Sequence, residues 1–324
     1  MPGKKINNMQ TVLVAGGGGF IGSHLCKSLL SDNFKVICVD NFVTSNKRNV
    51  EELLPDKNFR LIEQDITKSF EPGEKIDFIF HLASPASPNA KSPRSYINFP
   101  VETLLANSQG THMLLDLARE NKSKFLYVSS SEIYGDPEVS PQKEDYFGNV
   151  NPNGPRSVYD ESKRFGEAIT MAYFRKFGLN IRIIRIFNTY GPKMQKDDGR
   201  VVSNFINQAL WEKDFTIYGD GSQTRSFCYV DDMVSGLKLA MFKDGTQGKV
   251  YNLGNPDERS VKELADIIKK LTGSESKIIF EELPFDDPKT RRPDIERAKE
   301  ELGWEPMVRL EEGLQRTIEY FRSL

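Results

Sequence analysis

Cysteine and histidine are both scarce in this 324-residue chain, with three of each. The cysteines are odd in number and widely spaced, and the histidines lie far apart. Neither set has the spacing of a disulfide framework or of a zinc site. We therefore expect no metal ion, and we expect the histidines to serve packing or the surface: His24, His81 and His112.

The chain also lacks a strong charge of one sign and an apolar run long enough to cross a membrane. Its formal net charge is -2, whereas a nucleic-acid partner requires a basic field. The first ten residues are polar, with no apolar segment behind them that would indicate a secretory leader. These absences predict a cytoplasmic protein with neither nucleic acid nor a membrane as partner.

What the chain does contain is an alternation of short β-branched runs with amphipathic stretches. Continuous apolar runs flanked by helices indicate a parallel sheet that is covered on both faces. The fold class is therefore α/β, a doubly wound parallel sheet of the Rossmann type. Strands are predicted at residues 11–15, 35–39, 59–62, 78–82, 125–129 and 181–186, and helices at residues 21–31, 101–121 and 159–177.

The pattern changes after about residue 190, where helical periodicity dominates and strands become scarcer. We expect residues 1–190 to form the dinucleotide-binding domain and residues 191–324 to form mainly a smaller substrate-binding lobe, with some segments returning to the sheet. No linker or internal repeat separates the two parts, so they should pack together around a cleft. Helices are predicted here at residues 202–211, 232–242, 261–271 and 311–321, with loops at residues 219–221 and 286–288.

A glycine-rich turn, GGGGFIG at residues 16–22, follows the first strand and opens a helix. Glycines let the backbone approach a pyrophosphate and present amide donors at the helix N-terminus. Asp40 ends the second strand, where a carboxylate accepts hydrogen bonds from ribose hydroxyls and repels a 2′-phosphate; Lys47 and Arg48 weaken that preference slightly. The pattern predicts NAD rather than NADP, bound by Gly16, Gly19, Phe20, Ile21, Gly22 and Asp40.

Two further strand ends are placed to contact the same cofactor. Asp65 and Ile66 follow the third strand, where the adenine edge should lie. Ala83 and Ser84 follow the fourth strand, where the middle of the cofactor should pass.

Tyr159 and Lys163 lie four residues apart at the start of a predicted helix, with Ser157 as a plausible N-cap. This spacing places both side chains on one helix face. A phenol with a pKa near ~10 is a poor base at neutral pH. A fixed ammonium and the positive nicotinamide ring of an oxidised cofactor would stabilise the phenolate. The serines at residues 129–131 end the preceding strand and supply a hydroxyl to orient the reacting oxygen of a substrate.

With these motifs together, the chain resembles the extended short-chain dehydrogenases, and within them the nucleotide-sugar decarboxylases that act on UDP-glucuronate. The resemblance runs from Val12 to Phe321. Ser130 stands where these enzymes often carry Thr, Ser162 where they often carry Gly, and residues 89–98 diverge. The stretches that carry the resemblance are HLASPASP (81–88), SSEIYGDP (130–137), YDE (159–161), RIFNTYGP (185–192), DGRVVSNF (198–205), GSQTR (221–225) and RPDI (292–295).

The resemblance implies a decarboxylation that passes through a ketone. Tyr159 takes the proton of the sugar 4-hydroxyl while hydride moves from C4 to NAD. The resulting β-keto acid loses carbon dioxide, and Tyr159 and Ser130 stabilise the enolate. C5 is reprotonated and hydride returns to C4, which gives UDP-xylose and regenerates NAD. The catalytic residues implied are Tyr159, Lys163, Ser130, Glu132 and Arg225.

The resemblance also implies substrate contacts and an assembly. Glu132 and Arg225 match groups placed near the departing carboxyl group, although Arg225 could equally clamp the diphosphate, as its counterpart does in sugar epimerases. A homodimer is implied, paired through the helices at residues 101–121 and 159–177. Surface salt bridges remain an alternative reading for Arg291 and Arg292, which sit in a charged segment. Substrate binding is implied for Ser84, Ser131, Asn188, Arg200, Val202, Arg225 and Arg291.

Three alternatives stay open beside the decarboxylase. A UDP-sugar 4-epimerase typically lacks Glu132. A nucleotide-sugar 4,6-dehydratase usually shows an Asp-Glu pair after the catalytic Thr, where this chain has Ser131 followed by Glu132. A catalytically inactive NAD-binding regulator would show a degraded Tyr-Lys motif, yet Tyr159 and Lys163 are both present. The sequence therefore favours the decarboxylase.

Overall fold

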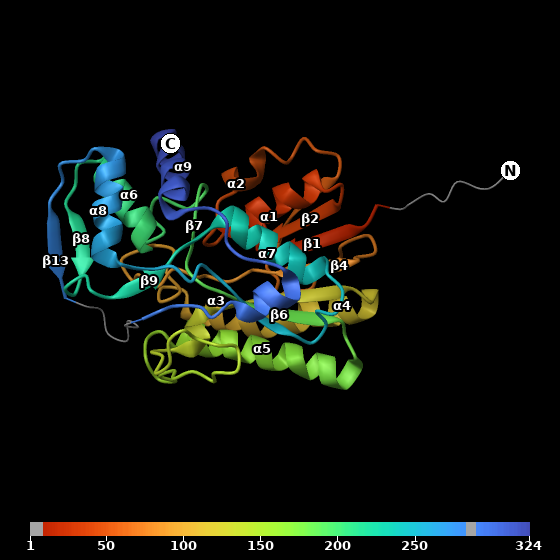
Figure 1. Cartoon of the computed structure of the whole chain (residues 1–324). Helices are drawn as coiled ribbons and strands as arrows, with labels where there is room; N and C mark the ends of the chain where they lie inside the picture. The colour runs from red at the N-terminus through yellow and green to blue at the C-terminus, as the bar shows by residue number, and fades with distance from the viewer. Residues whose placement is uncertain (1–8, 283–289) are drawn as a thin grey trace.

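Seven parallel strands form the central sheet, in the order β11-β6-β5-β4-β1-β2-β3 (Figure 1). The computed structural model describes residues 9–282 and 290–324, and the predicted loop at residues 286–288 lies outside them. The order runs outward in both directions from the β1–β4 pair, so the predicted doubly wound sheet is confirmed. The strands are β1 (Thr11–Ala15), β2 (Lys35–Asp40), β3 (Phe59–Glu63), β4 (Phe78–His81), β5 (Lys124–Ser130), β6 (Ile181–Ile186) and β11 (Val250–Leu253).

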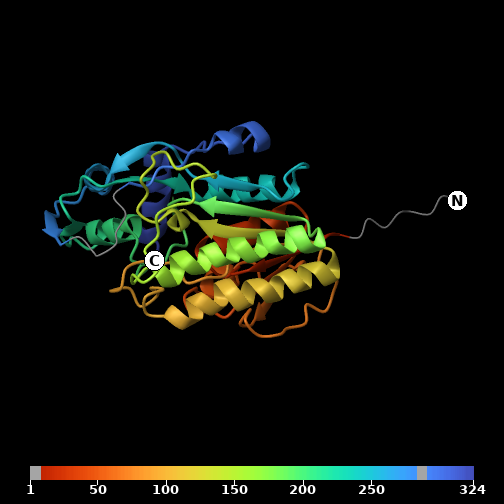
Figure 2. The same cartoon turned by 90° about the horizontal axis from the view of Figure 1, so that it is seen from below.

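Helices cover both faces of this sheet because successive strand residues point to opposite sides. Val12 and Val14 of β1 enter one apolar core, and Leu13 and Ala15 enter another. Figure 2 shows the α3–α4 stretch and α5 side by side along one face. The first core is closed by α1 (Phe20–Ser31) and α7 (Val230–Phe242), and the second lies under α4 (Thr111–Asn121) and α5 (Ser157–Phe177), with α3 (Pro100–Leu105) beside them.

Two predicted helices differ in detail from the structure. The stretch predicted as one helix at residues 101–121 contains a π-helical segment, η1 (Ala106–Gly110), between α3 and α4. Ser157 is the first residue of α5 rather than its N-cap. The backbone N–H of Ser157 already donates to the Gly154 carbonyl, so the turn that starts the helix lies earlier in the chain.

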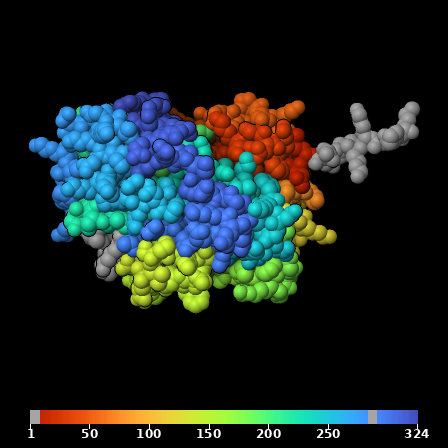
Figure 3. Space-filling model, in the orientation of Figure 1, coloured from red at the N-terminus to blue at the C-terminus, as the bar shows by residue number. Residues whose placement is uncertain are grey.

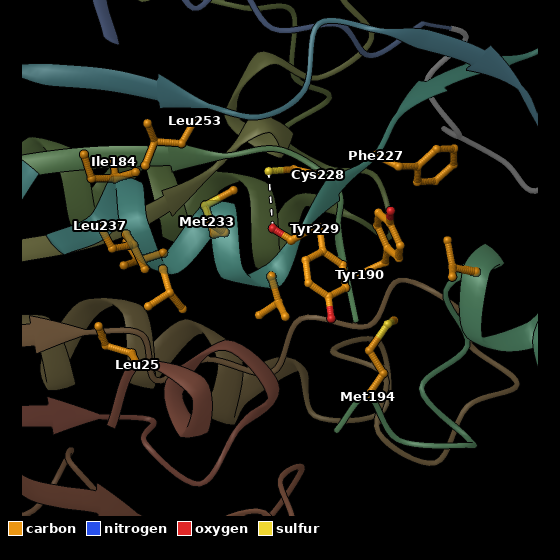
Figure 4. Packing of buried hydrophobic residues seen from close by; sticks show 14 of the residues in the cluster. Leu25, Ile184, Tyr190, Met194, Phe227, Cys228, Tyr229, Met233, Leu237 and Leu253 are labelled. Carbon is orange, nitrogen blue, oxygen red and sulfur yellow. Dashed lines mark hydrogen bonds between the residues drawn. The ribbon is translucent and has the colours of Figure 1, made fainter. Parts of the chain in front are cut away.

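The residues beyond 190 pack on the sheet through one continuous apolar cluster (Figure 4). It joins Leu25 of α1 and Ile184 of β6 to Leu237 of α7 and Leu253 of β11. In the space-filling view the C-terminal residues lie directly against the N-terminal ones (Figure 3). Strand β11 belongs to the main sheet, so the apolar core is not divided near residue 190. The assignment of residues 1–190 to the dinucleotide and of residues 191–324 to the substrate stays a prediction.

Short sheets and helices build the remainder of the C-terminal part. Strand β7 (Thr189–Tyr190) pairs with β10 (Cys228–Tyr229), β8 (Phe215–Tyr218) with β13 (Ile278–Glu281), and β9 (Thr224–Ser226) with β12 (Glu258–Ser260). None of the helices in the described part of the chain is long and apolar enough to span a membrane. The other elements are α2 (Arg48–Glu51), η2 (Ser131–Tyr134), α6 (Val201–Leu210), α8 (Val261–Thr272), η3 (Ala298–Leu302) and α9 (Leu310–Arg322).

Candidate active site

A cavity of about 190 Å³ lies at the carboxyl ends of the first four strands. This edge of a parallel sheet is where α/β folds bind ligands. Ser84, implied as a substrate contact, lines this cavity and not the larger one described below. The residues predicted for NAD that line it are Gly16, Gly19, Asp40, Asp65, Ile66 and Ala83.

The glycine turn between β1 and α1 has no room for side chains at Gly16 and Gly22. A Cβ on Gly22 would lie 2.1 Å from the Gly16 carbonyl oxygen, and a Cβ on Gly16 would lie 2.6 Å from the Ala83 nitrogen. Gly19 occupies the N-cap of α1, and no side chain among the described residues caps that helix. The first N–H groups of α1, at the predicted residues 20–22, thus stay available to an anionic group such as a pyrophosphate.

Asp40 is held at the end of β2 by three hydrogen bonds. Its carboxylate accepts from the backbone N–H groups of Gly18 and Phe42, both at 2.9 Å, and from the Ser45 hydroxyl at 2.7 Å. Burial raises the pKa of this carboxyl, and the hydrogen bonds oppose that rise. A carboxylate offers roughly four acceptor positions, so room remains for a ribose hydroxyl. The chain therefore fits a dinucleotide at this edge.

A second cavity, of about 360 Å³, is lined by residues from both parts of the chain. Guanidinium groups are prominent among its lining residues, which suits a ligand with phosphate and carboxylate groups. Aromatic side chains such as Phe205 and Tyr218 line it as well. Six residues implied for catalysis or substrate line it: Glu132, Asn188, Arg200, Val202, Arg225 and Arg291.

Tyr159 is buried in the first turn of α5, near residues that line the second cavity. Burial raises the pKa of its phenol. A hydrogen bond with Ser130 and the nearby Arg200 guanidinium oppose the rise, whereas the Glu132 carboxylate adds to it. Ser130 therefore acts on the phenol of Tyr159, the residue with which the resemblance pairs it.

Lys163 lies beside Tyr159 with its ammonium 5.7 Å from the centre of the phenol ring. Its Nζ donates to the Val128 carbonyl at 2.9 Å. Burial lowers the pKa of Lys163 to about 7, against the opposing field of Glu167. Burial thus favours the uncharged forms of both Tyr159 and Lys163. An oxidised nicotinamide ring supplies a hydride acceptor and a positive charge that favours the phenolate.

Glu132 is surrounded by guanidinium groups. Burial alone would raise its pKa, but Arg291, Arg156 and Arg225 hold the pKa at about 2. Arg156 forms an ion pair with this carboxylate, and Nη2 of Arg291 lies 3.4 Å from it. Arg291 is 2% exposed and also donates to the Ser131 carbonyl. The structure therefore places Arg291 against Glu132, and the surface salt-bridge reading of Arg291 is wrong.

Tyr96 and Asp160 are site residues that the sequence reasoning missed. The Tyr96 ring stacks on Tyr159 with a centroid distance of 4.9 Å and an interplanar angle of 11°. The hydroxyl of Tyr96 and Oδ1 of Asp160 are buried and have no hydrogen-bond partner among the described residues. Buried polar atoms are normally paired, so these two atoms beside Tyr159 are exceptions to the usual pairing.

Asn107 is a third missed residue, and it joins the cofactor cavity to α5. It lies in the π-helical segment and is fully buried. Its side-chain amide donates to the hydroxyls of Ser84, at 2.8 Å, and Ser162, at 3.1 Å. The Ser162 hydroxyl in turn donates to the Tyr159 carbonyl at 2.9 Å. The serine that replaces a common glycine here therefore helps to hold the start of α5.

The chain is similar to proteins of a known family. The profile of the NAD dependent epimerase/dehydratase family matches residues 12–254. The chain belongs to this family of enzymes. NAD is the cofactor of the family, and the glycine turn and Asp40 fit it. The relationship makes the chain an extended short-chain dehydrogenase, as the sequence predicted.

Three individual proteins show how close the relationship is. UDP-glucuronic acid decarboxylase 1 of Xenopus tropicalis is 50% identical over 312 residues, which cover 96% of this chain and 72% of that protein. UDP-glucuronic acid decarboxylase 6 of Arabidopsis thaliana is 48% identical over 317 residues, covering 98% and 90%. The crystal structure of UDP-glucuronic acid 4-epimerase from Bacillus cereus, with UDP-glucuronic acid and NAD, has a TM-score of 0.87 at 30% identity, covering 97% and 99%.

Proposed function

We propose that this enzyme decarboxylates UDP-glucuronate to UDP-xylose through a 4-keto intermediate and regenerates NAD in each turnover. The observation that carries the proposal is Glu132, held anionic among guanidinium groups beside the Tyr159–Ser130 pair, in a chain half identical to UDP-glucuronic acid decarboxylases. An epimerase of the same fold was crystallised with UDP-glucuronic acid. A decarboxylase and a 4-epimerase can therefore bind the same nucleotide sugar. The two activities differ in whether the carboxylate is lost or retained.

The residues of the chain have distinct tasks in this reaction. Tyr159 takes the proton of the sugar 4-hydroxyl, and Ser130 orients that oxygen by a hydrogen bond. When carbon dioxide leaves, negative charge moves from the carboxylate to the oxygen on C4, where Tyr159 and Ser130 stabilise the enolate. Glu132 is anionic above pH ~2 and repels charge from the carboxylate position, so it favours this movement.

Arg291 is the better candidate for the carboxylate end of the sugar, and Arg225 for the diphosphate. Arg291 contacts Glu132 directly, whereas Arg225 acts least on the pKa of Glu132 among the three guanidinium groups. Arg225 lines the same cavity next to Gln223. The sequence left two roles open for Arg225, contact with the departing carboxyl group or with the diphosphate. Here Arg291 takes the first role and Arg225 the second.

Replacing Glu132 tests the proposed function at its most specific residue. We expect Glu132→Gln to lower carbon dioxide release from UDP-glucuronate by roughly 100-fold or more, the scale of a lost electrostatic group in an active site. UDP binding, measured by calorimetry, should change little. Glu138→Gln is the matched control, because Glu138 is exposed on the following loop. If Glu132→Gln released carbon dioxide at nearly the original rate, the proposed role of Glu132 in decarboxylation would be wrong.

We infer that the enzyme works as a homodimer. The helices α3 and α5 lie side by side (Figure 2) and expose apolar side chains, among them Val101, Leu104 and Phe165. A two-fold axis next to them would bring identical apolar patches together. We infer a cytoplasmic location from the composition of the chain.

A further inference from the structure

We infer that Glu167 and Arg185 act together as positioning residues that set the charge of Lys163, and with it the pH range in which the Tyr159–Lys163 pair works. The inference rests on the proposed function, because it requires Lys163 to be charged during turnover. Neither Glu167 nor Arg185 lines either cavity. Their effect therefore reaches the reaction through Lys163.

Lys163 is buried, and no carboxylate of the described residues forms an ion pair with its side-chain nitrogen. Among the hydrogen bonds and ion pairs of the described residues, Nζ has one protein partner, the carbonyl of Val128 at 2.9 Å. The rings of Tyr127 and Tyr159 lie 5.2 and 5.7 Å away. A carbonyl and two ring faces do not neutralise an ammonium, and burial brings its pKa to about 7. Small changes in the surrounding field therefore change its charge near neutral pH.

Glu167 is the carboxylate that opposes this loss of charge. It lies four residues after Lys163 on α5, and so on the same face of the helix. Its field raises the pKa of Lys163. The Ser129 hydroxyl donates to Oε1 of Glu167 at 2.6 Å, which fixes this carboxylate against the end of β5. Glu167 therefore acts on Lys163 from a fixed position.

Arg185 of β6 limits the effect of Glu167. Its Nε and Nη2 donate to the two carboxylate oxygens of Glu167 at 2.9 and 2.8 Å, a bidentate ion pair. Nη1 of Arg185 also donates to the Tyr134 hydroxyl and to the Glu144 carbonyl. A cation opposes the field of an adjacent anion, so we expect Arg185 to weaken the effect of Glu167 at Lys163. The charge of Lys163 should thus depend on both members of the Glu167–Arg185 ion pair.

The other titratable neighbours are uncharged near neutral pH. Burial and the charge of Lys163 lower the pKa of His81 to about 3, so its ring is neutral. Burial raises the pKa of Tyr127 well above its ordinary value. Burial also raises the pKa of Tyr134, next to Arg185, to about 12. Glu167 is therefore the charged group that acts on Lys163, and Arg185 of β6 is the cation paired with it.

Two substitutions of opposite sign test this inference. The measurement is the pH profile of carbon dioxide release by the holoenzyme with UDP-glucuronate. The rate should fall at high pH because Lys163 loses its proton, and this fall is the alkaline limb of the profile. Glu167→Gln removes the anion and leaves the cation, so the limb should move to lower pH by about one unit. Arg185→Gln removes the cation and leaves the anion, so the limb should move to higher pH. A merely structural ion pair would lower the rate in both variants and leave the limb in place.

Three further variants serve as controls and as a substitute if Glu167→Gln or Arg185→Gln alone prevents folding. Glu167→Asp and Arg185→Lys retain both charges and should leave the limb where it is. The double variant Glu167→Gln/Arg185→Gln removes both members of the ion pair, so neither is left buried without its partner. Its limb should still move to lower pH, because Glu167 is the carboxylate that raises the pKa of Lys163.

A direct titration separates this inference from the proposed function. In protein labelled with ¹³C-lysine, the Lys163 signal can be assigned by its loss in Lys163→Arg, and its pKa followed by NMR in each variant. Shifts of opposite sign in the pKa of Lys163 would support the inference even if no carbon dioxide were released. The absence of carbon dioxide would overturn only the proposed function. Unmoved values, or shifts in the same direction for Glu167→Gln and Arg185→Gln, would overturn the inference.

Discussion

Burial acts on every ionisable side chain around Tyr159, and its effect is decided by the partners of each group. Glu132 has guanidinium partners, and its pKa is about 2. Asp160 lies in the same region with an unpartnered Oδ1 among the described residues, and burial with the charge of Glu132 raises its pKa to about 8. Two carboxyl groups of one site therefore carry different charges at neutral pH, which is typical of catalytic sites.

The raised pKa of Asp160 predicts a pH-dependent cost in stability. Its ordinary pKa is 3.8 and its folded value about 8, so between these values the folded protein binds more protons than the unfolded chain. Stability from this residue is therefore lost as pH rises. Asp160→Asn removes this titration. The melting temperature of the variant should therefore rise relative to that of the unaltered protein as pH increases from 5 to 8.

Thermal unfolding of both proteins at several pH values measures this gain. Asp244→Asn, at an exposed position, is the control and should show no such trend. A melting-temperature difference for Asp160→Asn that stays constant, or shrinks, as pH rises would show that the Asp160 carboxyl is not held in its protonated form.

Single residues were predictable where a local pattern marks them. Tyr159 and Lys163 share a helix face, and the serines end a strand, so both were visible in the sequence. Tyr96 lies in the divergent stretch at residues 89–98, and nothing local to it indicates that its ring stacks on Tyr159. Arg291 sits in a charged segment of the sequence but is buried against Glu132. Such contacts depend on the tertiary fold.

At the scale of elements, strand ends were the most informative feature. The carboxyl ends of parallel strands meet at one edge, which brought Gly16, Asp40, Asp65 and Ala83 into one cavity. The π-helical segment at η1 was not predictable, because one extra residue in a turn leaves the apolar pattern on either side intact. That segment nevertheless holds Asn107, which links Ser84 to Ser162.

The glycine turn predicts different effects for two similar substitutions. A Cβ on Gly22 would collide with backbone atoms of residues 16 and 17, whereas a Cβ on Gly19 would meet only the Gly16 oxygen, at 3.2 Å. We expect Gly22→Ala to destabilise the fold by several degrees in melting temperature or more. Gly19→Ala should keep the fold but weaken NAD binding, because Gly19 lines the cavity.

Thermal unfolding and NAD titration of both variants separate these effects. Gly178→Ala is a control for left-handed strain alone, since Gly178 has φ +65° and open space around it. Equal melting temperatures for Gly19→Ala and Gly22→Ala would contradict the close-approach argument for this turn.

At the scale of the whole molecule, the sequence predicted the class of fold better than the division of the chain. Helical periodicity marked α6 to α9, but the short strands in the C-terminal part carry too few residues to show an alternating pattern. Strand β11 extends the main sheet next to β6, and the core runs without a break into α8 and α9. Long-range strand pairing of this kind has no local signature.

The inferred homodimer gives a prediction at this scale. Light scattering should give twice the chain mass for the unaltered protein. Phe165→Glu places a charge on the exposed apolar face of α5, where Phe165 is 48% exposed, and should shift the protein toward monomer. Met307→Glu is the control, because Met307 is 76% exposed just before α9, a helix that packs on α6 and α8. A monomeric unaltered protein, or equal effects of both substitutions, would rule out this interface.

The most direct test of the central claim is to incubate the holoenzyme with UDP-glucuronate and follow carbon dioxide, the nucleotide sugar and NADH together. We predict carbon dioxide and UDP-xylose in equal amounts with no net accumulation of NADH. Tyr159→Phe should slow both products by roughly two to four orders of magnitude, the scale of a lost acid–base group. Conversion of UDP-glucuronate to its C4 epimer with the carboxylate intact and no carbon dioxide would contradict the account.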